Sequence, residues 1–123
     1  MRQGKLTAAY NTLTRLYRTP GLPFSTSQKL FLLKHKLQPY FDAQAEKQRV
    51  ILEASGQEQK DGTYEITPEI RKAFAEITNT EVEWKEGAID ILITEDDAKA
   101  LGITGEILDI FDGLIIFTEV PDA

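Results

Sequence analysis

Residues 26–55, TSQKLFLLKHKLQPYFDAQAEKQRVILEAS, decide the fold of the first half of this chain. Apolar residues recur here every three or four positions, which is the spacing of one face of an α-helix. The members of this face are Leu30, Leu33, Leu37, Phe41, Ala45 and Leu52. Gly56 provides a stop. Because Pro39 removes a backbone donor inside the pattern, we predict one long helix with a kink or short break near residues 36–39.

A shorter helix is predicted before it, again from apolar residues three or four positions apart. This stripe consists of Leu6, Tyr10, Leu13 and Tyr17. The Thr-Pro-Gly sequence at residues 19–21 ends the helix, and Ser25 is placed to cap the next one. Because the link is short, we expect an antiparallel helical hairpin over residues 1–56.

The turn Leu30-Phe31-Leu32-Leu33 is apolar on all sides. Each residue advances an α-helix by about 100°, so four in a row cover its whole circumference. A single partner helix can bury only one side. We therefore expect this turn to contact a second surface, either in the second half of the chain or on another subunit.

Residues 57–123 change to shorter patterns. Thr67, Thr94 and Thr104 are each placed to begin a helix. Alternating apolar residues predict strands at 63–66, 81–84 and 89–93, the last two as a hairpin, and residues 114–117 predict an inner strand. The expected fold class is α+β: the helical hairpin, followed by a small, mainly antiparallel sheet with short helices, in a single domain over residues 1–123.

Charge is divided between the two halves. Residues 1–50 carry nine Lys or Arg against two acidic residues, a net charge of +7. Residues 51–123 carry five Lys or Arg against eighteen acidic residues, a net charge of −13. We thus distinguish a basic hairpin subregion, 1–56, from an acidic α+β subregion, 57–123. Opposite charges attract, within one chain, between copies or toward an outside partner.

Catalytic and metal-site patterns are weak. The sequence has no cysteine and one histidine, His35, and no glycine pattern of a phosphate-binding loop. Asp90 and the acidic run 95–97 could hold a hard cation, but acids after Thr94 are expected at a helix start. We expect no catalytic residues, no metal and no cofactor, and hence not an enzyme. No apolar run approaches the roughly 20 residues of a membrane span, so we expect a cytoplasmic protein without membrane contact.

These observations favour a protein that binds a protein partner or itself, as a homo-oligomer. The apolar turn of residues 30–33 would supply the affinity. Neighbouring lysines would supply the association rate and the choice of partner. They are Lys29, Lys34, Lys36 and Lys47.

The alternative is a nucleic-acid-binding accessory protein that uses the basic helices. Its candidate residues are Arg2, Lys5, Arg15, Arg18, Lys34 and Lys36. Tyr10, Tyr17 and Phe31 could stack on bases. The net charge of −6 opposes this hypothesis, because it repels phosphate at long range.

The order of several segments resembles small bacteriophage or prophage proteins of unassigned function. These segments are residues 46–53, 61–66, 72–77 and 81–84. The resemblance implies a phage-encoded accessory, assembly or structural protein, located in the bacterial host cytoplasm or in the virion. It implies no catalytic residue.

Overall fold

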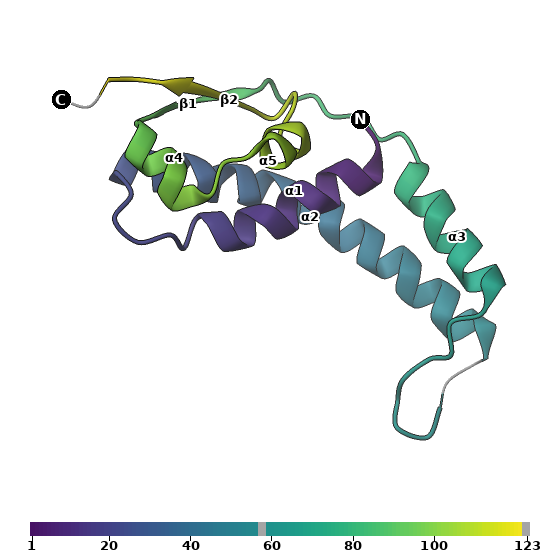
Figure 1. The fold of residues 1–123 in the computed structure, drawn as a ribbon. Helices are drawn as coiled ribbons and strands as arrows, with labels where there is room; N and C mark the ends of the chain where they lie inside the picture. Colours follow the sequence, from purple (N-terminus) through teal and green to yellow (C-terminus); the bar gives the residue numbers. More distant parts are fainter. Residues whose placement is uncertain (57–58, 122–123) are drawn as a thin grey trace.

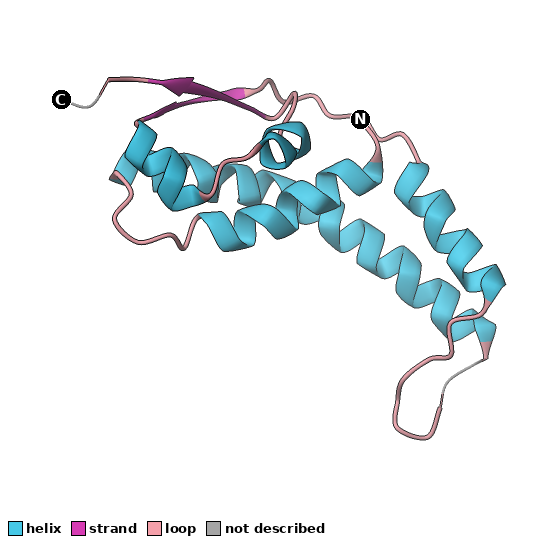
Figure 2. Cartoon of the chain, in the orientation of Figure 1, coloured by secondary structure: helices cyan, strands magenta, loops and turns pink. Residues whose placement is uncertain are grey.

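The computed structural model describes residues 1–56 and 59–121 and has an α+β architecture (Figure 1). The elements follow one another as α1 (Gln3–Leu16), α2 (Phe24–Ser55), α3 (Pro68–Asn79), β1 (Ile89–Ile93), α4 (Glu95–Leu101), α5 (Gly105–Ile110) and β2 (Ile115–Glu119). Helices dominate, and within the described ranges there is one small sheet, which lies above the helices in Figure 2.

The first two helices form the predicted antiparallel hairpin. At its closed end the rings of Tyr17 and Phe31 lie 6.2 Å apart. Toward the other end, Gln3 Nε2 donates a hydrogen bond to the Tyr40 carbonyl oxygen at 2.8 Å. The predicted cap at Ser25 is wrong, because α2 begins two residues earlier than predicted, at Phe24 after Pro23, without a side-chain cap.

Helix α2 runs without interruption from Phe24 to Ser55, so the predicted short break near Pro39 does not occur. Pro39 lies on the exposed side of the helix. The backbone bond that proline cannot donate is therefore lost where water can replace it. Gly56 ends the helix as predicted, with a left-handed φ of 67°.

The second half of α2 and helix α3 extend together from the rest of the molecule (Figure 1). We call residues 46–55 of α2 together with α3 the arm. The two helices run antiparallel, and Ile70 and Ile77 of α3 are buried. Thr67 begins α3 as predicted, since its hydroxyl accepts a hydrogen bond from Ile70 N at 3.3 Å.

The sheet corrects the predicted topology. Strands β1 and β2 pair in parallel, with Ile89 opposite Ile115 and Ile93 opposite Glu119, so the expectation of a mainly antiparallel sheet is wrong. Parallel neighbours need a long crossover, and here α4 and α5 provide it. Residues 63–66 and 81–84 form no strand, so the predicted hairpin of 81–84 with 89–93 is wrong; Glu81 makes only an isolated bridge with Arg2. The prediction of an inner strand at residues 114–117 is also wrong in its position, because β2 is an edge strand of a two-stranded sheet.

The main hydrophobic core joins both halves of the chain. Leu6 and Leu13 of α1 and Leu30 of α2 are fully buried in it, together with Ile91 of β1 and Phe111 after α5. The helical hairpin thus covers the inner face of the sheet and its crossover. Because the basic and acidic subregions share this core, they fold as parts of one structure.

Candidate protein-interaction surfaces

The predicted apolar turn is divided between the core and the surface. Leu30 and Leu33 are buried in the main core. Phe31 and Leu32 keep 51 % and 49 % of their surface exposed. The second surface that this turn was expected to meet is therefore partly supplied by the chain itself, and only Phe31 and Leu32 remain available to a partner.

Three of the four candidate lysines of the interaction surface are engaged within the chain. Lys29 Nζ donates to the Asp90 carbonyl oxygen at 2.8 Å, and Lys36 Nζ lies 3.2 Å from Glu86 Oε2. Lys34 Nζ lies 5.1 Å and 5.3 Å from the ring centroids of Tyr10 and Tyr17. Of these three contacts, Lys36–Glu86 pairs opposite charges of the two halves, Lys29 bonds a backbone carbonyl of the second half, and Lys34 lies over rings of its own half.

Some basic residues of the nucleic-acid alternative are also paired with acidic side chains of the chain itself. Arg2 Nε lies 3.9 Å from Glu81 Oε1, and Lys5 Nζ lies 4.0 Å from Asp112 Oδ2. Arg15 is exposed, with no ion pair among the described residues. The ion pairs are exposed, so each contributes little to stability, but they lower the positive charge of this face.

Aromatic rings contact one another across the α1–α2 hairpin and along α2. The rings of Tyr10 and Phe41 stack at 4.3 Å, and Phe31 stacks on His35 at 6.5 Å. Arg18 Nε donates to the Tyr17 hydroxyl at 3.4 Å and lowers the pKa of that phenol. Because Lys34 lies over both Tyr10 and Tyr17, these rings are already engaged and are poorly placed to stack on bases.

The arm carries an apolar groove that the sequence reasoning did not identify. The groove has a volume of about 380 Å³. It is lined by Glu46, Lys47, Val50, Ile51 and Ile77. Val50 keeps 52 % of its surface exposed. The sequence feature that indicates this groove is the run of consecutive apolar residues 50–52. Like residues 30–33, this run covers a wider part of the helix surface than one partner helix can bury.

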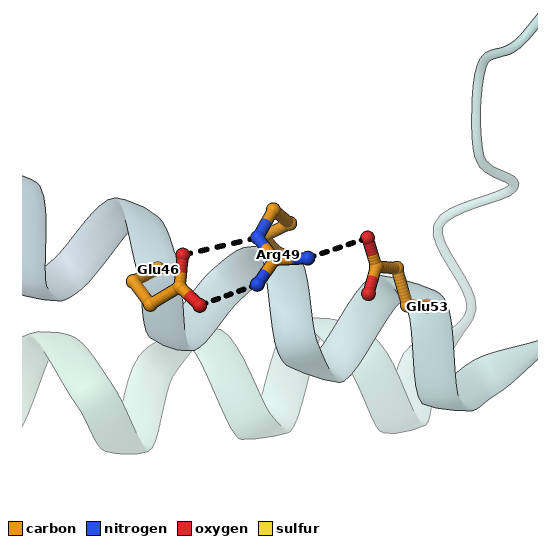
Figure 3. A network of polar contacts seen from close by, with 3 residues as sticks. All are labelled: Glu46, Arg49 and Glu53. Carbon is orange, nitrogen blue, oxygen red and sulfur yellow. Dashed lines mark hydrogen bonds and ion pairs between the residues drawn. The ribbon is translucent and has the colours of Figure 1, made fainter.

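The charged residues beside this groove are organised by Arg49 (Figure 3). Arg49 Nε donates to Glu46 Oε2 at 3.0 Å, and Arg49 Nη1 donates to Glu53 Oε1 at 2.6 Å. The hydrogen bond from Arg49 lowers the pKa of Glu46, and the two carboxylates raise the pKa of Arg49. Lys47, by contrast, has no ion pair among the described residues.

The acidic run after Thr94 serves to begin α4. The Thr94 hydroxyl accepts a hydrogen bond from Asp97 N at 3.1 Å, and Glu95 pairs with Lys99 at 3.3 Å. In residues 1–56 and 59–121, no group of three or more acidic, histidine or cysteine side chains is arranged to hold a metal ion. Acids in the first turn of α4 oppose the helix dipole, as expected from the sequence.

Comparison with known proteins gives no relative: no family model, curated protein or solved structure matches this chain. Across the described part of the chain, no helix combines the length and apolar character needed to cross a lipid bilayer. Function is therefore inferred from the surfaces themselves, among which the arm groove combines exposed apolar residues with a lysine that lacks an ion pair there.

Proposed function

We propose that this protein is a non-enzymatic interaction protein that associates with a second copy of itself through the arm. The observation that supports this function is the apolar groove of about 380 Å³ between α2 and α3, with Val50 half exposed at its side. Two packed helices bury one side of each other and leave such a groove for a further helix. A second arm supplies that helix.

Charge favours a second copy as the occupant. When two copies of α2 cross antiparallel about a two-fold axis at Val50, a residue three positions before Val50 faces one three positions after it in the partner. These residues are Lys47 and Glu53. The axis therefore creates two symmetric Lys47–Glu53 pairs around an apolar centre. Lys47 has no competing ion pair within the described residues, whereas Glu53 already accepts a hydrogen bond from Arg49, so in the dimer each Glu53 carboxylate would be shared between Arg49 and the partner's Lys47.

The resemblance to phage proteins supplies the biological setting of this proposal. Accessory and assembly proteins act through contacts with other proteins or with themselves, and the apolar groove of the arm is a surface for such a contact. We propose a role of that kind, in the host cytoplasm or the virion.

The mass in solution tests the proposal. We expect sedimentation velocity to detect a dimer at low ionic strength that weakens as salt is added, because the flanking ion pairs are screened. Val50→Asp places a charge at the centre of the contact and should give a monomer. Lys47→Glu should weaken the dimer about tenfold or more, and the double variant Lys47→Glu/Glu53→Lys should restore it.

Phe31→Asp is the matched control, because Phe31 is equally exposed on the same helix but lies far from the arm. We expect it to leave the dimer intact. A monomer in Phe31→Asp together with a dimer in Val50→Asp would move the interface to the turn of residues 30–33. A wild-type monomer at every ionic strength would refute self-association altogether. Circular dichroism confirms that each variant is folded.

A further inference from the structure

The two edges of the sheet differ in how they are covered. The register directs the backbone groups of Ile89 and Ile93 toward β2, where Ile89 N donates to Leu114 O at 3.0 Å and Val120 N donates to Ile93 O at 2.9 Å. The backbone of Asp90 therefore faces the other edge of β1. There its carbonyl oxygen accepts a hydrogen bond from Lys29 Nζ, at 2.8 Å. The outer edge of β1 is thus occupied at Asp90 by the Lys29 side chain of α2.

The outer edge of β2 is open. By the same register the backbone N–H and C=O groups of Phe117 and Glu119 point away from β1, and no other strand of the described chain pairs with them. Exposed edges are usually protected by proline or lysine within the strand. The sequence of β2, IIFTE, has neither, and its one charged residue, Glu119, stands at its last position. This edge can therefore accept another strand.

An apolar hollow of about 230 Å³ lies beside this edge. Its lining is formed by Ile93, Glu95, Ala98, Ile103, Leu108, Phe117 and Glu119, from both strands and the crossover. Leu108 keeps 48 % of its surface exposed. An open backbone edge next to an apolar hollow is the combination used in strand addition, where main-chain bonds give affinity and a pocket selects alternate side chains.

We propose that the outer edge of β2 binds an extended segment of another protein as a third strand. The segment places an apolar side chain in the hollow and a lysine or arginine beside Glu119. The acidic residues that line the hollow indicate which charged side chain the partner carries. Glu95 is paired with Lys99, whereas Glu119 has no ion pair among the described residues. A basic residue on the incoming strand supplies the missing charge.

A second copy of the chain fits this edge less well. Two-fold pairing of β2 about Phe117 would place each Glu119 opposite Ile115 of the other copy. It would also bring together the acidic rims of two molecules that each carry a net charge of −6. Such a contact leaves Glu119 without a cation. The edge lies apart from the arm, so its occupancy is independent of self-association there.

Amide NMR with defined peptides tests the proposal. The probes are capped seven-residue threonine peptides with leucine at position 3 and lysine at position 5, so that both side chains lie on the face of the sheet that carries Phe117 and Glu119, and matched peptides with glutamate in place of lysine. We expect the lysine peptides to shift the amide signals of Phe117 and Glu119, and the glutamate peptides to bind about tenfold more weakly. Backbone N-methylation of the peptide should abolish the shifts, because it removes the donors that the edge carbonyls need.

Two variants distinguish the site from general attraction. Glu119→Lys should reverse the preference, so that the glutamate peptide binds more tightly than the lysine peptide. Thr118→Lys adds positive charge on the same strand but on the opposite face of the sheet, and should leave the preference for the lysine peptide unchanged. An equal loss of that preference in both variants would overturn the proposal.

The remaining outcomes are also decisive. If no lysine peptide shifts Phe117 and Glu119, strand addition by a basic segment is refuted. If these signals shift with protein concentration alone, the occupant is a second copy and the proposal is wrong. Performing the titration on Val50→Asp as well as on the wild type separates this result from any failure of the arm contact.

Discussion

Gly4 of α1 packs directly against Thr78 of α3: a β-carbon added at Gly4 would lie 2.4 Å from Thr78 Cγ2 and 3.2 Å from the Thr78 carbonyl oxygen. Alanine would gain about 1 kcal/mol in helix propensity. The steric conflict costs about 1–3 kcal/mol. We therefore expect Gly4→Ala to lower the free energy of unfolding by about 1 kcal/mol, measured by urea denaturation.

A double-variant cycle isolates this contact. Thr78→Ser removes Cγ2, the atom in the closest approach, while it keeps the hydroxyl. In that background Gly4→Ala should become neutral or stabilising. The same loss in both backgrounds would show that the helices do not meet at these two residues.

The indole of Trp84 is the second stability test. Its ring lies 5.4 Å from that of Tyr40, but its buried Nε1 has no hydrogen-bond acceptor in the described structure. Trp84→Phe keeps an aromatic ring and removes the unsatisfied donor, so we expect unfolding free energy within about 1 kcal/mol of the wild type, or higher. Trp84→Ala should cost about 2–4 kcal/mol, because packing is lost. A large loss in Trp84→Phe would indicate that Nε1 is bonded.

The contact between Lys29 of α2 and the outer edge of β1 is tested by Lys29→Met. This variant keeps the aliphatic stem and removes the donor to the Asp90 carbonyl oxygen. We expect a loss of about 1 kcal/mol in unfolding free energy. Lys36→Met is the matched control on the same helix, since it removes only the exposed pair with Glu86 and should cost less. Equal losses of unfolding free energy in the two variants, measured by thermal or urea denaturation, would show that the Lys29 hydrogen bond stabilises the fold no more than an exposed ion pair does.

The Arg49 network predicts a pH dependence. The hydrogen bond from Arg49 lowers the pKa of Glu46 below its ordinary value. The pairing therefore stabilises α2 above the ordinary pKa of a glutamate and is lost as the pH falls through the lowered value. Carboxyl NMR should show Glu46 titrating at lower pH in the wild type than in Arg49→Met. Identical titration in the two proteins would contradict the network.

A salt titration with duplex and single-stranded DNA tests the nucleic-acid alternative. Arg2 and Lys5 face acidic residues, and Lys34 lies over the tyrosine rings that would stack on bases. We therefore expect no binding in fluorescence anisotropy at low salt. Binding with a steep salt dependence would support the alternative instead.

Helix boundaries set by local contacts could be predicted from the sequence. Thr67, Thr94 and Thr104 each accept a hydrogen bond from the backbone N–H three residues later. A cap depends mainly on its own helix turn, so the residue types predicted these three starts, although the same argument failed at Ser25, because α2 begins after Pro23. Strand pairing is different. An alternating pattern indicates that residues 89–93 are extended, but it does not indicate whether residues 81–84 or 115–119 lie beside them.

The candidate site was predictable only in part, for the same reason. The apolar turn was located, and its division into buried Leu30 and exposed Phe31 follows from where the core lies. The engagement of Lys29 and Lys36 depends on Asp90 and Glu86, which are distant in sequence. The arm groove depends on where Ile77 packs, which no local pattern specifies.

The continuity of α2 has a mechanical consequence. With a rise of about 1.5 Å per residue, the 32 residues of α2 extend for about 48 Å along the path of the helix. Its first half is anchored beneath the sheet and its second half forms one side of the arm, so the helix acts as a strut of set length between them. Two molecules bound at the tip of the arm and at the β2 edge would therefore be held at a defined distance from each other.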